Sequence, residues 1–274
     1  MRALHLAITA VVVAVGVTVA TAQDRVARTP TATDQATFAS VSQAQAAMDR
    51  AAAAQKYIFL FFWKDKTPQT DRAWSVLQPA VANMANSAEV VSIQIADPAE
   101  KRIIDKYGVT RAPMPLVLAV APCGAITKAF PKPFDENQLR AAFVSPGAQR
   151  CLKALQDRKL VLLCVLNHAA QQDQMIAPQG VRDFKADQRF GRFTEVILVN
   201  ADDAGETKFL KEFQVSTNAS QPMTVFLAPP GVVVGTFGGA ATKETLVAKL
   251  AAAQSSINGE GHGKAHERRC GCKD

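Results

Sequence analysis

The residues best suited to chemistry lie near the end of the 274-residue chain. Cys270 and Cys272 are separated by one glycine, and His262 and His266 precede them. Two thiolates and two imidazoles form a donor set for a soft or borderline ion such as Cu(I) or Zn(II). Alternatively, the two thiols form a strained disulfide that exchanges readily, and the nearby basic side chains favour the thiolate.

The segment that carries these residues is too polar to pack against a folded domain. We expect residues 254–274 to form a disordered tail, in which the cysteines are incidental or link two chains. We therefore expect no cofactor, with Cu or Zn held by the tail as the alternative. The competing function is then a thiol-disulfide oxidoreductase or metal-handling protein that uses the Cys-Gly-Cys tail.

The three other cysteines are Cys123, Cys151 and Cys164. The total of five is odd, so at least one thiol is unpaired within a monomer. Cys164 lies within an apolar run typical of a buried strand, where a thiol serves as a small apolar side chain. Cys123 is expected in a turn and Cys151 on a helix, and the sequence does not establish whether they pair.

A buried strand followed at once by a helix organises the first half of the chain. The run from Tyr57 to Trp63 is apolar on both faces, and Thr67 followed by Pro68 is a strong helix start, with the threonine as N-cap. This stretch resembles the thioredoxin family, in which a strand ending in Phe-Trp leads into a helix that carries the redox pair Cys-Gly-Pro-Cys. The resemblance places Thr67-Pro68-Gln69-Thr70 in that redox slot, without either cysteine.

The second half resembles thioredoxin at the same place. Gln174-Met-Ile-Ala-Pro178 is similar to the Lys-Met-Ile-Ala-Pro that follows the redox pair in that family. The redox slot is then filled by Ala170-Gln-Gln-Asp173, again without cysteine. Cys164 falls where the family has its buried aspartate, and Phe61 falls there in the first half. A hydroxyl, methyl or carboxylate cannot exchange sulfur, so we expect no catalytic residue at Thr67, Thr70, Ala170 or Asp173.

One proline of the thioredoxin pattern is present in both halves. Pro115 and Pro222 each precede a strand of the expected hairpin, although Pro113 fits better when counted from Gly108. In the family this proline is cis and leaves the preceding backbone free to pair with an extended peptide. The resemblance therefore makes Pro115 and Pro222 candidates for peptide binding.

The expected elements follow the thioredoxin-like order β, α, β, α, β, β, α twice. In the first half we expect helices at 40–55, 68–84 with a kink at Pro79, 100–107 and 136–143. The expected strands are 57–63, 90–95, 116–120 and 125–130. After a linker at 144–147 the pattern repeats, with helices at 149–158, 177–190, 206–213 and 243–252. The strands of this half are expected at 160–166, 195–199, 224–227 and 232–237. Residues 115–124 align with 222–231 without a gap. We therefore predict an α/β protein of two tandem thioredoxin-like domains, 39–144 and 148–253, each a mixed central sheet flanked by helices.

The N-terminus has the pattern of a secretory signal. Arg2 precedes an apolar run from residue 6 to 20, and Ala20-Thr-Ala22 fits a cleavage site. We expect residues 1–22 to be a signal peptide, residues 23–38 a flexible lead-in, and the product to be extracytoplasmic, periplasmic or secreted, without a stable membrane span. The formal charge of +7 is spread among acidic residues and forms no basic stripe for nucleic acid. The function expected from all of this is a redox-inactive module that binds or scaffolds a protein or peptide partner.

Overall fold

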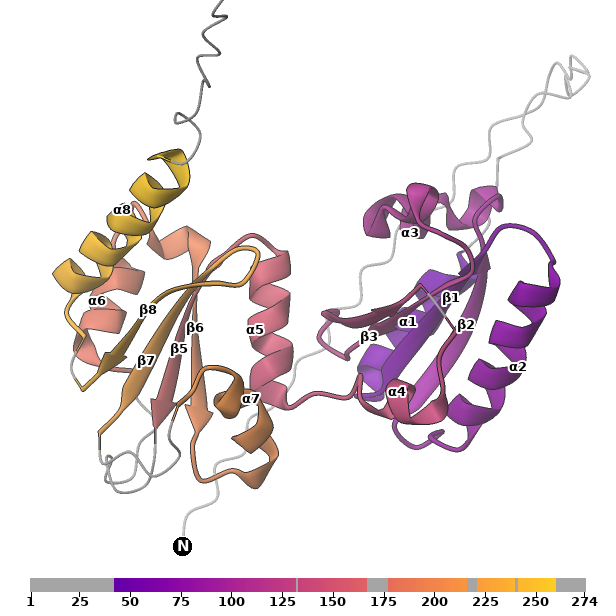
Figure 1. Ribbon diagram of the computed structural model, residues 1–274, viewed down its shortest axis with the longest axis horizontal. Helices are drawn as coiled ribbons and strands as arrows, with labels where there is room; N and C mark the ends of the chain where they lie inside the picture. The colour runs from indigo at the N-terminus through magenta and orange to yellow at the C-terminus, as the bar shows by residue number, and fades with distance from the viewer. Residues whose placement is uncertain (1–41, 132, 167–176, 216–220, 240, 260–274) are drawn as a thin grey trace, which may run out of the picture. The chain divides into compact units, whose positions relative to one another are not determined.

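The computed structural model describes residues 42–131, 133–166, 177–215, 221–239 and 241–259. Within them lie two four-stranded mixed sheets with the same strand order, β2-β1-β3-β4 in sheet A and β6-β5-β7-β8 in sheet B (Figure 1). The predicted order β, α, β, α, β, β, α is confirmed in both halves. No helix in these ranges is both long and apolar enough to cross a membrane.

Sheet A is built around β1 (Tyr57–Trp63), whose residues are buried except at its end. It pairs in parallel with β2 (Ala88–Gln94) and antiparallel with β3 (Leu116–Val120), which pairs antiparallel with β4 (Ile126–Phe130). Because successive side chains of a strand point to opposite faces, β1 supplies two cores at once. Helices α1 (Gln43–Ala53) and α3 (Lys101–Tyr107) contribute to one core, and α2 (Pro68–Ala82) and α4 (Glu136–Arg140) to the other.

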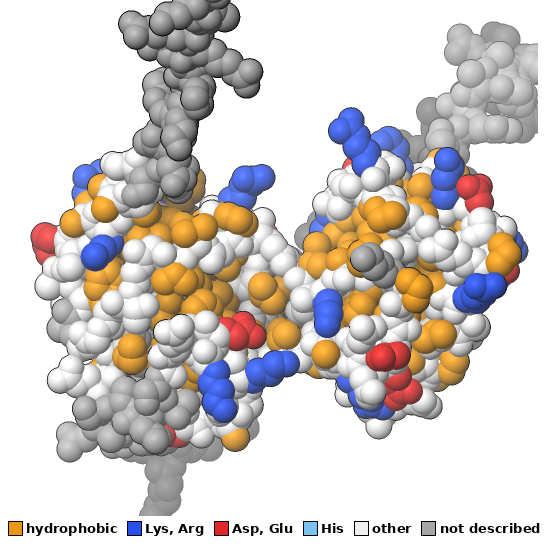
Figure 2. Space-filling model, viewed as in Figure 1, with side chains coloured by type: hydrophobic (Ala, Val, Ile, Leu, Met, Phe, Trp, Pro, Cys, Tyr) orange, Lys and Arg blue, Asp and Glu red, His pale blue; other side chains and the backbone are white. Residues whose placement is uncertain are grey.

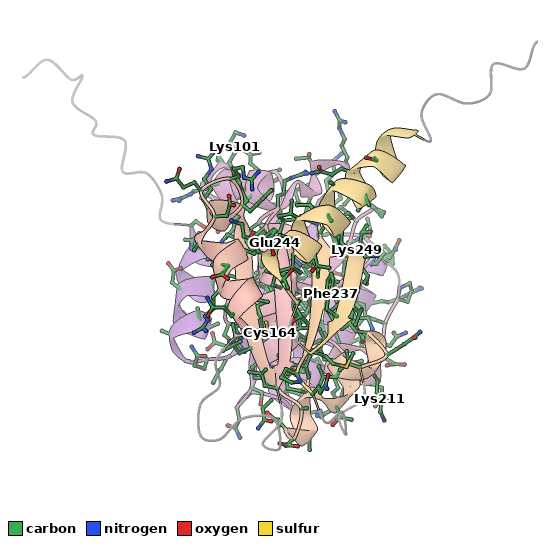
Figure 3. The ribbon with its side chains drawn as sticks, turned by 90° about the vertical axis from the view of Figure 1, so that its left-hand side faces the viewer. Lys101, Cys164, Lys211, Phe237, Glu244 and Lys249 are labelled. Atoms are coloured by element: carbon green, nitrogen blue, oxygen red, sulfur yellow. The ribbon has the colours of Figure 1, made fainter. Side chains whose placement is uncertain are left out.

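Sheet B repeats the arrangement around β5 (Leu160–Leu166). The pairing with β6 (Thr194–Asn200) is parallel, while β7 (Met223–Ala228) and β8 (Val232–Gly238) form the antiparallel side. Helices α5 (Pro146–Gln156) and α7 (Thr207–Glu212) pack on one face, and α6 (Gln179–Ala186) and α8 (Lys243–Gly259) on the other. Cys164 and Phe237 both belong to the cluster beneath α6 and α8 (Figure 3).

Several expected boundaries differ from the structure. Helix α5 begins at Pro146 within the predicted linker, because Ser145 caps it and a proline is well tolerated in the first turn. Helix α2 continues through Pro79. Helix α6 ends at Ala186, well before residue 190, and Asp187 after it is extended. Helix α8 runs to Gly259, so the start of the predicted tail is helical.

A buried glutamate ties the first helix of each half to the segment after the second strand. The Glu100 carboxylate accepts hydrogen bonds from the Ser42 hydroxyl at 2.6 Å and the Ala44 amide at 3.1 Å. Glu100 is 5% exposed and is the last residue of a short 3₁₀ turn capped by Asp97, and Glu206 in the second half is likewise 5% exposed at the end of a turn capped by Asp203. Because the helix N-terminus has unpaired amides, the carboxylate satisfies donors that would otherwise be buried without partners.

The counterpart in the second half is Glu206. Its carboxylate accepts from the Ser145 hydroxyl at 2.5 Å and from the Gly147 amide at 2.7 Å. Ser42 and Ser145 are the N-caps of α1 and α5, so the same three-part contact occurs at the same place in each repeat. We call this contact the glutamate clasp.

The edge strands β4 and β8 differ in surface chemistry. Strand β4 carries Lys128, whereas β8 has no charged residue and leaves Val232 and Val233 about half exposed. Figure 2 shows apolar side chains gathered over β8. Both strands have a register irregularity against their neighbour, between Ala119 and Val120 in sheet A and between Phe226 and Leu227 in sheet B. Such a bulge disrupts the ladder at a sheet edge.

Candidate functional site

The first redox slot is occupied by a hydrogen-bonded pair of threonines. Thr67 is the N-cap of α2, as the sequence predicts, and its hydroxyl accepts from the Thr70 amide at 3.2 Å. The two hydroxyl oxygens lie 3.1 Å apart, and the Thr70 hydroxyl also donates to the Asp65 carbonyl at 2.9 Å. Thr70 is buried, while Thr67 is exposed. These contacts cap the helix and close the turn before it.

The aromatic residues beside this slot have structural partners. The Trp63 indole nitrogen donates to the Ser92 hydroxyl at 2.9 Å. The Trp74 ring lies 5.2 Å from the Phe61 ring, between centroids. Phe61 is the residue at the position of the family's buried aspartate, and it is 2% exposed. The residue that the sequence resemblance aligns with that aspartate is therefore an apolar ring.

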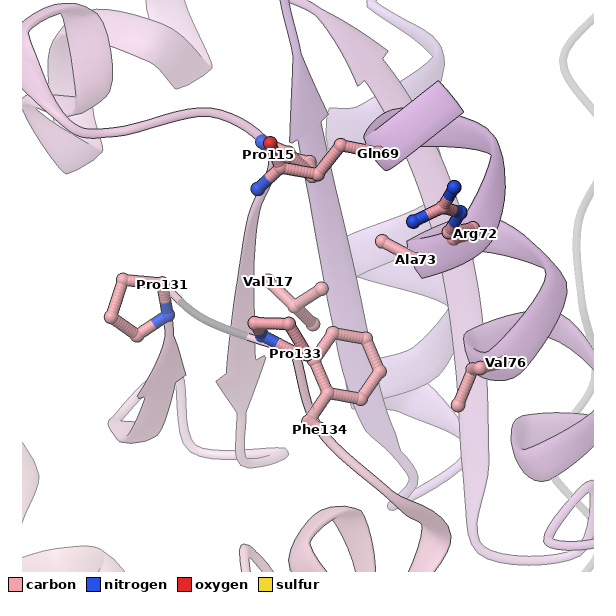
Figure 4. A pocket seen from close by; sticks show the side chains of 9 residues that line it. All are labelled: Gln69, Arg72, Ala73, Val76, Pro115, Val117, Pro131, Pro133 and Phe134. Carbon is pink, nitrogen blue, oxygen red and sulfur yellow. The ribbon is translucent and has the colours of Figure 1, made fainter. Parts of the chain in front are cut away.

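A pocket of about 480 Å³ lies beside the slot, on the α2 side of sheet A (Figure 4). Its α2 wall carries Gln69, Arg72, Ala73 and Val76. The spacing i, i+3, i+4, i+7 places these four on one face of the helix. Val76 is 41% exposed, so its apolar side chain is accessible on this wall.

Sheet A and the chain after β4 complete the pocket. Pro115 and Val117, at the start of β3, are buried at its base, and Pro131, Pro133 and Phe134 form the facing wall. The Phe134 ring is 5.5 Å from the Phe130 ring, so this wall rests on the core. The volume lies within the range of about 300–1,000 Å³ typical of ligand sites.

The two candidate prolines differ in the conformation of the peptide bond that precedes them. The Met114–Pro115 peptide bond is cis and Pro115 lines the pocket. Among the described residues of the second half, the cis bond is Pro229–Pro230, in the turn between β7 and β8, and Gln221–Pro222 is not cis. The cis form implied for Pro222 is thus wrong; the two forms of an X–Pro bond differ little in free energy, so the local contacts decide between them.

Several predicted site residues lie outside the described residues. These are Ala170 and Asp173 of the second slot, and His262, His266, Cys270 and Cys272 of the tail. Within the described part of the chain, no group of three or more metal-ligating side chains comes together.

The three described cysteines are free thiols and none lines the pocket. Cys123 is exposed in the turn between β3 and β4, as expected. Burial raises the pKa of the Cys151 thiol to about 12 and that of Cys164 to about 11. Both are therefore neutral at physiological pH, in which state a thiol is a poor nucleophile.

Sequence reasoning identified Pro115 and the slot but missed most of the pocket. It did not single out Arg72, Val76 or the wall formed by Pro131, Pro133 and Phe134. A signal was present, because residues 69, 72, 73 and 76 share a helical face that combines apolar and cationic side chains. The facing wall is a Pro-x-Pro-Phe stretch directly after the last strand of the sheet.

No family model matches the sequence, and no curated protein matches it. Among solved structures, the thioredoxin Deadhead from Drosophila melanogaster shows 19% identity over 37% of this chain and 91% of its own, with a TM-score of 0.30. The first two thioredoxin domains of Eps1p from Saccharomyces cerevisiae show 10% identity over 70% of this chain and 88% of their own, with a TM-score of 0.29. An N-terminal domain of the alkylhydroperoxide reductase AhpF from Enterococcus faecalis shows 15% identity over 75% and 98%, with a TM-score of 0.27.

Similarities at sequence identities of 10–19% bear on the fold alone. The assignment rests on the strand order and pairing of the chain itself, in which a parallel pair is followed by an antiparallel hairpin in each of two sheets. This is a tandem thioredoxin-like fold.

Proposed function

We propose that this tandem thioredoxin-fold protein acts outside the cytoplasm as a redox-inactive binding module. Its first half would hold an apolar segment of another protein in the pocket between α2 and the wall formed by Pro131, Pro133 and Phe134. Export is supported by the signal-like sequence of residues 1–22, and the absence of redox chemistry by the threonine pair at the slot. The second half and the tail would then contribute to scaffolding, not catalysis.

The observation that carries the proposal is the pocket itself. Its base and one wall are formed by proline, valine and phenylalanine side chains, and Val76 remains exposed on the opposite wall. Burying one large apolar side chain of a partner there contributes about 1.5–3 kcal/mol before the costs of association. Binding of a short peptide is therefore expected to be weak and to depend on its apolar residue.

The test uses short synthetic peptides and one charge substitution at the pocket rim. N-acetylated Gly-Ser hexapeptides that carry a single Leu or Phe would be titrated into the isotopically labelled protein and followed by NMR, with all-Gly-Ser peptides for comparison. We expect the Leu and Phe peptides to shift the amide signals of α2 and β3. Val76→Asp should weaken this binding about tenfold, because it places a charge against the apolar side chain.

The matched control is Val232→Asp on β8. Val232 is 49% exposed and lies on the other sheet, so its substitution should leave peptide binding unchanged. The proposal fails if the Leu and Phe peptides bind no better than the Gly-Ser peptides. It also fails if Val76→Asp and Val232→Asp have the same effect.

A further inference from the structure

The pocket contains two side chains with donor groups, and neither has a partner among the residues that the structure describes. Arg72 is the one charged side chain among the described residues that line it, and Gln69 lies one helical turn earlier on the same wall. Within the described residues, neither the Arg72 guanidinium nor the Gln69 amide makes a hydrogen bond or an ion pair. The rest of the lining is apolar, so an anion at this wall would meet no competing acidic side chain there.

Proline supplies much of the remaining wall. Pro115, Pro131 and Pro133 have no backbone N–H and therefore cannot donate to a ligand. Among the described residues of the lining, the side-chain donors available to a ligand are accordingly those of Gln69 and Arg72. A guanidinium beside an apolar surface suits a carboxylate that lies next to an apolar group, since it can donate two parallel hydrogen bonds.

We propose that the pocket recognises the C-terminus of a partner polypeptide that ends in a large apolar residue. The terminal side chain would pack between Val76 and Phe134, and the terminal carboxylate would pair with Arg72, with Gln69 as a second donor. A chain end presents both groups on one residue, so only that residue has to be ordered. An internal segment would need two ordered residues to present the same groups, at a greater cost in conformational entropy.

The electrostatic setting favours this arrangement. Arg72 is exposed on α2, so a bound carboxylate would displace water without leaving a buried charge unpaired. The contact is partly screened by salt and should weaken as ionic strength rises. Burial of the apolar side chain should show no such dependence.

The inference rests on the proposed function. A comparison of three peptides distinguishes failure of the inference from failure of the proposed function. Three hexapeptides of equal composition would be compared by NMR titration: one ending in Leu with a free carboxylate, one ending in Leu amide, and one with Leu at an internal position and an amidated end. We expect the free acid to bind about tenfold more tightly than the amide. In Arg72→Gln this preference should fall below about twofold, while the amide binds as it does to the unchanged protein.

The control variant is Arg102→Gln, which removes another exposed arginine, on α3 and away from the pocket. It should retain the full preference for the free acid. Equal binding of the free acid and the amide to the unchanged protein would overturn the inference but leave the proposed function intact. A preference that survives in Arg72→Gln would overturn it as well. If no Leu peptide binds, the proposed function fails and the inference fails with it.

Discussion

Glu100 in the first half and Glu206 in the second occupy the same place and make the same pair of hydrogen bonds. The two halves also share the strand order and the irregularity next to the edge strand. They differ in how the space around the central strand is filled. In β1, Phe61 packs near Trp74, whereas in β5 the corresponding Cys164 lies 4.0 Å from the Thr224 hydroxyl.

The aromatic volume of the second half comes from other elements. Phe184 on α6 and Phe226 on β7 have ring centroids 5.5 Å apart, and Phe184 stacks on Phe190. Phe226 pairs with Gly235 in the ladder, where sheet A has Ala119 paired with Lys128. The comparison shows that the same backbone arrangement can be packed with large side chains from different strands and helices. The clasp satisfies backbone donors, and its glutamate is the same in both halves.

The largest effect is expected when the clasp is removed. Glu100→Ala or Glu206→Ala would leave a buried helix amide and a partly buried serine hydroxyl without their acceptor, which we expect to cost about 2–3 kcal/mol of unfolding free energy in the affected half. Glutamine retains an acceptor oxygen, so Glu100→Gln and Glu206→Gln should each cost about 1 kcal/mol or less.

The two halves can be followed separately in denaturant titrations. Both tryptophans of the chain lie in the first half, so their fluorescence reports that half, while circular dichroism reports both. Glu100→Ala should shift the fluorescence transition, and Glu206→Ala should shift the dichroism and leave the fluorescence nearly unchanged. Equal shifts of both signals by either variant would show that the halves do not unfold independently.

A smaller effect is expected at the one residue where the two clasps differ. Ala44 in the first half corresponds to Gly147 in the second, and a Cβ at Gly147 would lie 2.7 Å from Glu206 Oε2 and 2.8 Å from Val199 Cγ2. Gly147→Ala should therefore destabilise the second half by about 1–2 kcal/mol, even though alanine favours helix.

The control for this substitution is Gly238→Ala, where an added Cβ would meet no atom within 4 Å. It should change the unfolding free energy by less than about 0.5 kcal/mol. If Gly147→Ala is as mild as Gly238→Ala, the Glu206 side chain can move aside, and the second clasp is looser than the first.

The sequence was sufficient to predict the order of elements, because apolar runs such as 57–63 and 160–166 define the central strands and caps such as Thr67 define helix starts. It did not reveal the clasp, since a glutamate after a strand has the sequence appearance of a surface residue. Nor did it reveal the pocket, because Val76 and Phe134 are far apart in the chain and only the packing of α2 against sheet A brings them together. Helix ends such as that of α6 depend on tertiary contacts, which local propensity does not contain.

The smallest effect concerns the response of the two halves to alkaline pH. Burial raises the pKa of Cys151 from 9.0 to about 12 and that of Cys164 from 9.0 to about 11, whereas in the first half it raises that of Tyr107 from 10.0 to about 12. Because the unfolded chain loses these protons first, the stability that the neutral groups contribute is present below pH 9 and lost as the pH rises. The second half should lose about 0.4 kcal/mol per thiol by pH 9, where the first half has barely begun to respond.

This difference can be measured by repeating the denaturant titrations between pH 8 and pH 11. The dichroism midpoint should fall before the fluorescence midpoint does. Cys164→Ala lowers stability at every pH through the lost packing, yet it should flatten the decline above pH 9, because one of the two thiols that ionise on unfolding is gone. Parallel declines in the unchanged protein and in Cys164→Ala would mean that this thiol ionises equally well in the folded and unfolded chain. In that case the aromatic core around β1 and the thiol-containing core around β5 would differ in how they pack, but not in how their stability depends on pH.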